Sequence, residues 1–392
     1  MQLRERIDRR RSAGEGSGIV VDYEYLSPVV HRSEPIGRGP VLEQLLDAFE
    51  PVFDGGLPSS VAVTGPAGSG TSAIVAALFA AMNDRLGETG RSIGTTTRAA
   101  RAEPITWFVY VDTRRVRSEF AFYRTVLSAL STDSIPESGI GTDALRDRLQ
   151  DRLARRDRRA IVAVDHHDEP ETLSYRRARE LLDPVCDSSS TVAVGRGEPD
   201  GWDGTTIPVS PYRGHELVDV LTDRVSTSLS PGTIDHESIR SLSEWADGNA
   251  HDALAALYGA ADCAADSDSD RIEPRHLECA IDGVPDDCVH VDRALSLSET
   301  RQQVLSTLAS IDPADRPVRD VADDIAARSS LTTGTVKRFL YELADRGVIE
   351  RVPLPTTGSG RRPSAIELRF PTHVFNSLTP AANRASDLAP DE

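Results

Sequence analysis

The sequence has one lysine, Lys337, so nearly all of its 44 basic residues are arginines, and these face 62 acidic residues. Aromatic residues make up 5% of the 392 positions, and the net charge is -18. An acidic, lysine-poor, arginine-using composition is typical of proteins from extreme halophiles, in which excess charge maintains solubility in concentrated salt; an ordinary acidic protein is the alternative. For the chain as a whole, this charge disfavours a nucleic-acid partner.

Long apolar runs are also missing. No run approaches the ~18 residues that a membrane helix needs, and the charged start "MQLRERIDRRRS" lacks the apolar centre of a signal peptide. We therefore expect a cytoplasmic protein with no membrane partner.

The four cysteines, Cys186, Cys263, Cys279 and Cys288, include no C-x-x-C pair. Their spacing predicts reduced thiols, with neither a zinc site nor a redox motif.

A lysine is missing from a glycine-rich loop as well. The stretch "VAVTGPAGSGTSAIV" (61–75) predicts a strand, a tight turn and a helix, as in a phosphate-binding loop. Gly65, Gly70 and Ser72 fit the pattern G-x-x-x-x-G-K-[ST]. Thr71 stands where the pattern has the lysine that reaches the β and γ phosphates. The loop is therefore expected to lack the positively charged side chain that contacts the phosphates.

Five short apolar runs alternate with helical patterns between residues 19 and 210, which predicts an α/β domain with a five-stranded parallel sheet. A flexible arm is expected over 1–18, and a long mobile loop over the polar stretch 84–104. The predicted strands are 60–65, 105–112, 159–165, 190–195 and 205–209.

Residues 211–290 read as helices only and predict a helical lid domain. Residues 296–371 predict helices, a turn, a longer helix and two strands, the order of a winged helix-turn-helix. Thr332 or Thr333 would cap the longer helix. The tail 372–392 is expected to be disordered. Four side chains of the longer helix are expected to pack inward: Val336, Leu340, Tyr341 and Leu343.

The predicted winged helix carries positive charge, since residues 316–370 contain ten basic and seven acidic residues. A basic patch on a helix-turn-helix module predicts contact with double-stranded DNA. Arg361 and Arg362 lie in the wing turn and would contact phosphates or a minor groove. The groove-facing start of the longer helix would present Thr333, Thr335, Lys337 and Arg338.

The order of these parts resembles the archaeal, haloarchaeal-type origin-recognition and cell-division-control AAA+ replication initiator family. The resemblance covers residues 19–370 and rests on "PIGRGPVLEQLLDAF" (35–49), the phosphate loop, an acid-ended strand, "PYRGHELVDVLTDR" (211–224), "GNAHDAL" (248–254) and the terminal module. It implies an AAA+ domain, a lid, ATP or ADP as ligand, and replication origins as DNA partners.

The resemblance also implies a nucleotide site. Ile36 would lie against the base, while Ser72 and Asp165 would hold Mg²⁺. Other contacts to the nucleotide would come from the glycine loop and from the start of the lid: Gly65, Pro66, Ala67, Gly68, Ser69, Gly70, Thr71, Tyr212 and Arg224.

Four positions, each in a different motif of the catalytic site, depart from the family pattern. Thr71 replaces the loop lysine, and His166 replaces the glutamate that orients the attacking water. Arg196 stands near the expected sensor asparagine, and His251 near the second sensor arginine. Phosphoryl transfer depends on positioning and charge stabilisation, so we predict weak nucleotide binding and lost hydrolysis.

Residues 166–169, "HHDE", offer nitrogen and carboxylate donors that suit zinc or manganese. Adjacent residues after a strand point in different directions, however. We therefore favour an altered strand end with solvated polar side chains over a metal site.

The leading interpretation is a DNA-binding paralogue of the initiators, able to assemble with active paralogues. The alternatives are a nucleotide-switched initiator with residual ATPase activity and a transcriptional or regulatory relative.

Overall fold

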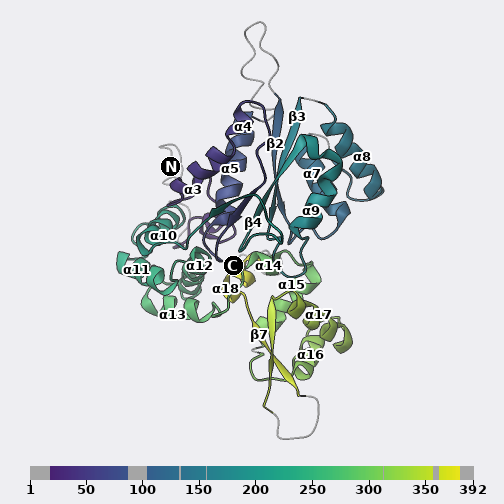
Figure 1. Cartoon of the computed structure of the whole chain (residues 1–392). Coiled ribbons are helices and arrows are strands. Elements are labelled where there is room, and N and C mark those ends of the chain that lie inside the picture. The colour runs from purple at the N-terminus through teal and green to yellow at the C-terminus, as the bar shows by residue number, and fades with distance from the viewer. Residues whose placement is uncertain are drawn as a thin grey trace. The chain divides into compact units, whose positions relative to one another are not determined.

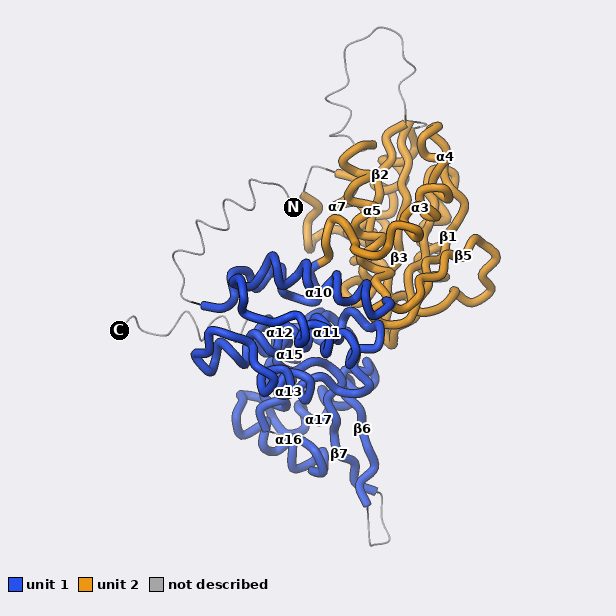
Figure 2. Tube along the Cα trace, turned by 90° about the vertical axis from the view of Figure 1, so that its left-hand side faces the viewer, with its two compact units in different colours: residues 1–30, 212–392 blue, residues 31–211 orange. Residues whose placement is uncertain are grey.

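A computed structural model describes residues 18–86, 104–131, 134–155, 157–311, 313–355 and 362–379. The chain divides into two compact units, which Figure 2 colours separately: residues 31–211, here called the α/β unit, and residues 1–30 with 212–392, here called the helical unit. Most of the expected arm over 1–18 and of the expected loop over 84–104 lies outside the described residues. None of the described helices is both long and apolar enough to cross a membrane.

The α/β unit is built on the predicted five-stranded parallel sheet, whose strand boundaries differ from the predicted ones by at most one residue. The runs are almost entirely apolar because both faces of a parallel sheet are covered. In sheet order the strands are β2 (Ile105–Asp112), β3 (Arg158–Asp165), β4 (Ser189–Gly195), β1 (Val61–Thr64) and β5 (Thr205–Pro208).

Alternate strand residues face opposite helical layers (Figure 1). One layer consists of α3 (Gly39–Ala48), α4 (Glu50–Phe53) and α5 (Thr71–Leu86). The other consists of α7 (Glu119–Leu130), α8 (Thr142–Leu153), α9 (Tyr175–Leu182) and the 3₁₀ turn η1 (Asp183–Ser188). On β2, Trp107 and Val109 pack with α7 and α8, whereas Phe108 and Tyr110 face the layer of α5. This alternation places the hydroxyl-bearing Tyr110 on the side of the glycine loop.

One continuous core holds the helical unit together, from Ile19 to Phe375. Its first helices are α2 (Tyr23–Leu26), α10 (Gly214–Ser228), α11 (His236–Trp245), α12 (Ala250–Asp266) and α13 (Pro274–Asp282). The remaining helices are α14 (Asp292–Leu295), α15 (Glu299–Ser310), α16 (Val318–Ala327), α17 (Thr333–Asp345) and α18 (Thr372–Leu378). Strands β6 (Ile349–Pro353) and β7 (Ser364–Leu368) pair antiparallel.

The sequence placed residues 19–30 in the α/β domain, but in the structure they belong to the helical unit. Val20 forms a bridge with Leu229, and Leu26 is fully buried in the helical core. The guanidinium of Arg224 in α10 donates to the carbonyls of Tyr25 (2.6 Å), Ser27 (3.4 Å) and Val30 (2.6 Å). This buried cation therefore ties the N-terminal segment to α10.

The C-terminal elements follow in the predicted order, but Tyr341 and the start of the tail differ from the prediction. Thr332 caps α17 by accepting from the Thr335 N–H (3.2 Å), and Val336, Leu340 and Leu343 are buried. Tyr341, expected inside, is 41% exposed, because it lies on the opposite side of α17 from those residues.

The predicted disordered tail is wrong at its start, since residues 372–378 form α18. Val374 and Phe375 are fully buried, and the Phe375 ring packs against Phe370 with centroids 4.7 Å apart. The overall composition of the tail predicted disorder. Burial of these two apolar residues is nevertheless enough to pack one short helix against the helical core.

Replacing Arg224 by alanine should leave three backbone carbonyls without their charged donor. Such a loss costs about 1.5 to 3 kcal/mol, so the free energy of unfolding should fall by that amount. Urea unfolding followed by circular dichroism measures the change. The matched control is Arg240→Ala, because Arg240 is exposed on α11. Equal stability of the two variants would contradict the structural role of Arg224.

Candidate functional site

The glycine loop between β1 and α5 has the backbone of a phosphate-binding turn. Gly68 and Gly70 adopt positive φ values of 71° and 87°, which favour glycine. A Cβ at Gly65 would lie 2.5 Å from the carbonyl oxygen of Val209, so only glycine fits there. α5 begins directly after the loop, and its first N–H groups have no partner within the helix. The loop therefore keeps the backbone arrangement that binds anions.

The side chains of the loop do not supply a cation. Thr71 is the first residue of α5, and its methyl carbon would lie 3.2 Å from a Cβ at Gly65. Ser69 is fully buried. Phosphates in this loop would therefore be held by backbone N–H groups and hydroxyls alone, without the charge that the lysine provides.

A tyrosine is bonded to one of the two side chains expected to hold Mg²⁺ and lies near the other. Asp165 is fully buried at the end of β3, and its carboxylate accepts hydrogen bonds from the Tyr110 hydroxyl and from the His166 N–H (2.7 Å). The Ser72 hydroxyl lies near enough to the Tyr110 phenol to lower its pKa slightly. The phenol is thus bonded to Asp165, with Ser72 nearby.

The electrostatics of this group favour a protonated phenol. Burial, followed by the negative charge of Asp165, raises the pKa of Tyr110 well above its usual value. At neutral pH the phenol is therefore a hydrogen-bond donor to the buried carboxylate. A metal ion at Asp165 would compete with this donor for the carboxylate.

The "HHDE" segment separates only some of its side chains. The His166 ring lies 3.4 Å from Asp165 Oδ2 and 3.6 Å from Glu169 Oε1, whereas the His167 ring packs on Tyr175 with centroids 5.7 Å apart. Asp168 accepts from the N–H of Arg196 (2.7 Å). The divergence expected from the sequence therefore holds for His167 and Asp168, but not for His166 and Glu169. The expected solvation is wrong for His167 and Glu169, whose side chains are buried.

Glu169 forms a buried ion pair with Arg114, which follows β2. Two hydrogen bonds of 2.8 and 2.7 Å join the guanidinium to the carboxylate, and the side chains are 4% and 6% exposed. Breaking a buried pair leaves one uncompensated charge and destabilises strongly. The only glutamate in this segment therefore helps to hold the strand ends together.

The expected sensor positions carry other contacts. His251 in α12 accepts the Val291 N–H at Nε2 (3.1 Å) and lies 2.8 Å from Asp252 through Nδ1. An imidazole that accepts at Nε2 is in its neutral form. His251 therefore does not offer the positive charge of an arginine. At the other position, Arg196 is exposed directly after β4.

The remaining predicted nucleotide residues fall in both units. Ile36, Pro66, Ala67 and Ser69 belong to the α/β unit, whereas Tyr212 and Arg224 belong to the helical unit. The Tyr212 N–H donates to the Gly248 carbonyl (3.1 Å), and Arg224 holds the N-terminal segment. Their contact with a nucleotide stays a prediction.

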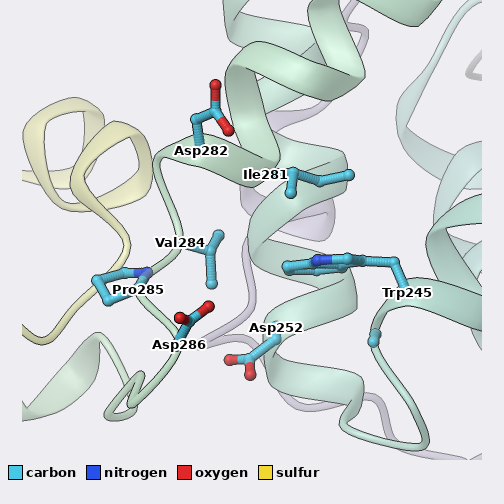
Figure 3. A pocket seen from close by; sticks show the side chains of 8 residues that line it. Trp245, Asp252, Ile281, Asp282, Val284, Pro285 and Asp286 are labelled. Carbon is cyan, nitrogen blue, oxygen red and sulfur yellow. The ribbon is translucent and has the colours of Figure 1, made fainter.

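A pocket in the helical unit is lined by three carboxylates, Asp252, Asp282 and Asp286, beside Trp245 and Ile281 (Figure 3). The aspartates come from α12, from α13 and from the turn that follows α13. Carboxylates repel the phosphates of a nucleotide. This pocket therefore does not replace the glycine loop as a nucleotide site.

The predicted DNA-contacting residues lie around α17. Arg338 is exposed, while Thr333, Thr335 and Lys337 are partly exposed near the start of the helix. Arg362 is exposed before β7, and Arg361 lies outside the described residues.

Sequence reasoning missed three features of these sites. The guanidinium of Arg351 in β6 lies over the ring of the exposed Tyr341, 4.5 Å from its centroid. This pair adds an aromatic and a cation to the surface of α17. Arg114 was also missed, as was Tyr110, although its hydroxyl is conspicuous in the apolar run "ITWFVYVD".

Two family models match the sequence. Residues 34–193 match the model of the AAA ATPase domain, and residues 218–282 match the model of the Cdc6 AAA+ ATPase-type lid domain. The chain has an AAA+ domain followed by a Cdc6-type lid. The predicted fold class is confirmed for both parts. No curated protein matches the sequence.

Solved structures share the fold of the AAA+ domain and lid at low identity. The Aeropyrum pernix ORC1 protein, solved in complex with DNA, has a TM-score of 0.61 and 18% identity, covering 95% of this chain and 100% of that one. The Aeropyrum pernix ORC2 protein, in its ADPNP-ADP complexes, has a TM-score of 0.53 and 14% identity with the same coverage. Cdc6p from Pyrobaculum aerophilum has a TM-score of 0.51 and 16% identity, again with that coverage.

Replacing Tyr110 by phenylalanine should remove one of the donors to buried Asp165 and lower the free energy of unfolding at pH 8 by about 1 to 3 kcal/mol. The difference in the free energy of unfolding between the wild type and the variant should shrink as the pH rises past about 10. Above that pH an unfolded tyrosine ionises, whereas the folded phenol, with its raised pKa, does not. The wild type then loses up to about 1.4 kcal/mol per pH unit, and the variant lacks this loss.

Urea unfolding at pH 8 and pH 11 measures both effects. Tyr25→Phe is the matched control, because the Tyr25 side chain is 42% exposed. An equal gap between the wild type and Tyr110→Phe at both pH values would contradict the raised pKa.

Proposed function

We propose that the chain is a DNA-binding paralogue of the archaeal AAA+ replication initiators in which ATP hydrolysis has been lost. The observation that carries the proposed loss of hydrolysis is the hydrogen bond from the Tyr110 phenol to buried Asp165. Mg²⁺ in such a site normally contacts a serine or threonine hydroxyl and an aspartate. Here the aspartate is bonded to an uncharged phenol instead.

The neighbouring groups argue in the same direction. Thr71 brings no charge to the phosphates, and Glu169 is held by Arg114. A phosphoryl transfer needs both charge neutralisation and an oriented water. Removing one stabilising group costs a factor of ~10² or more, so the combined changes leave turnover negligible.

Nucleotide binding without turnover remains part of the proposal. The glycine loop keeps its backbone, and its N–H groups can hold ADP or ATP weakly. A bound nucleotide would then act as a structural ligand. The runner-up, a nucleotide-switched initiator with residual ATPase activity, needs Mg²⁺ to bind Asp165 in competition with the Tyr110 phenol.

DNA binding is proposed for the C-terminal elements, taken together as a winged helix. Its support is the exposed basic and aromatic surface of α17 and β6, with Arg338, Tyr341 and Arg351, in a segment of net positive charge. The related ORC1 protein was solved in complex with DNA. Replication origins are the proposed target, active initiator paralogues are the proposed partners, and promoters are the target in the alternative regulatory role.

A loop cation should restore tight nucleotide binding. Thr71→Lys combined with Tyr110→Phe should bind Mg-ATP roughly ten- to a hundredfold more tightly than the wild type, because a charged hydrogen bond is worth about 1.5 to 3 kcal/mol. Equilibrium dialysis with and without Mg²⁺ measures this. The control is Thr71→Gln with Tyr110→Phe, which adds length without charge. Steady conversion of ATP to ADP by the wild type would refute the proposed loss of hydrolysis.

Arginine substitutions should distinguish contacts to DNA phosphates from contacts that determine the preferred sequence. Arg362→Ala should weaken binding to all duplexes and lower the salt-dependence slope by about 1, as expected for one phosphate contact. Arg338→Ala should change the preferred sequence. Fluorescence anisotropy with a random duplex pool and with selected sites measures both effects. Arg240→Ala is the exposed control on the lid. No binding of any duplex by the wild type at any salt concentration would refute the DNA-binding role.

A further inference from the structure

Three metal-ligating side chains from distant parts of the sequence converge in the helical unit. Cys263 lies on α12, Cys279 on α13 and His373 on α18. The two sulfur atoms are 2.9 Å apart, and Cys279 Sγ is 3.9 Å from His373 Nε2. The donor atoms of all three residues lie within 4.8 Å of one another.

The local packing holds the imidazole at this place. The Thr372 N–H, at the start of α18, donates to the Gly283 carbonyl (3.1 Å). A Cβ at Gly283 would lie 2.5 Å from His373 Cδ2, so a side chain at position 283 would push the ring away. Gly283 therefore makes space for the His373 ring beside the cysteines.

The chemistry of the donors selects a class of ion. Thiolates and imidazole together prefer zinc and similar transition metals over magnesium or calcium. Zinc–sulfur bonds of about 2.3 Å in a tetrahedral site set the sulfur atoms somewhat further apart than they are here, a shift that side-chain rotation can supply. Cys279 is exposed, so a fourth position is open to water.

The charge around the three donors also favours a cation. Asp266 lies three residues after Cys263 on α12, and Asp282 lies three residues after Cys279 on α13, so each shares a helix face with its cysteine.

We propose that Cys263, Cys279 and His373 bind one zinc-class metal ion, which fastens the C-terminal helix α18 to the lid helices α12 and α13. The sequence predicted no zinc site, because the two cysteines are 16 residues apart and the histidine follows 94 residues later. A disulfide would account for the two thiols but not for the imidazole that Gly283 accommodates.

The test uses the full chain, purified under reducing conditions and freed of metal by a chelator. Zn²⁺ is titrated in competition with a chromophoric chelator, and Co²⁺ is added separately to look for thiolate-to-cobalt charge-transfer absorption. One equivalent of metal is expected to bind and to raise the melting temperature. Cys263→Ser, Cys279→Ser and His373→Ala should each weaken binding tenfold or more.

Two kinds of control keep the result specific. Cys186→Ser, in the α/β unit, should bind as the wild type does. Cys288→Ser should also bind normally, because Cys288 belongs to a separate group with His251 and Asp252. His373→Cys retains a ligand and should keep the metal, which distinguishes lost ligation from misfolding. Circular dichroism checks the fold of every variant.

Three outcomes would overturn the proposal. The first is no metal uptake by the wild type. The second is that the folded Cys263→Ser and His373→Ala variants take up as much metal as the wild type does. This holds whether or not the Cys288→Ser variant loses its metal. The third is a Cys263–Cys279 disulfide, found by peptide mass spectrometry in chain kept under reducing conditions.

Discussion

The hydrogen bond from Tyr110 to Asp165 is the interaction on which the proposed loss of hydrolysis depends. A fully buried carboxylate must be compensated by a cation or by donors, because an unpaired buried charge is strongly unfavourable. In a site that binds Mg²⁺, the ion supplies this compensation. Here a phenol and a backbone N–H supply it, so Asp165 is stable without any ion. A buried carboxylate with two such donors does not require a bound metal for its stability.

This local replacement leaves the scaffold intact because the sheet is held by other forces. Both faces of the parallel strands are covered by apolar side chains, and the Arg114–Glu169 pair joins the segments that follow β2 and β3. Hydrophobic burial is spread over many residues, whereas phosphoryl transfer depends on a few charges. The fold of the α/β unit is therefore compatible with the proposed exchange of catalytic groups.

The sequence predicted the fold better than the site. Apolar runs gave the five strands to within one residue, because a covered parallel strand must be apolar throughout. The missing lysine at Thr71 was visible for a similar reason, since the glycine loop fixes its position. Tyr110 was not visible as a site residue, because a tyrosine inside an apolar run is ordinarily a core residue. Only the strand register, with Tyr110 opposite Ala163, brings its hydroxyl next to Asp165.

Long-range convergence explains what else the sequence did not reveal. Arg224 stays a predicted nucleotide contact, but the sequence gave no sign of its carbonyl partners almost 200 residues earlier. Cys263, Cys279 and His373 formed no recognisable spacing, because α18 returns to the lid only after the two-stranded sheet. Local periodicity can place each residue on a helix, but it carries no information on which helices meet.

The charge of the chain limits how the proposed DNA contact can work. A net charge of -18 repels DNA from most of the surface, so approach is restricted to the positive C-terminal segment. High salt would weaken phosphate contacts further, since they release counterions. Stacking and base contacts are less sensitive to salt, and the Tyr341–Arg351 pair with exposed Arg338 offers both an aromatic ring and planar guanidinium groups. The proposed interface is therefore one in which ring and guanidinium contacts carry a larger share of the affinity than charge alone.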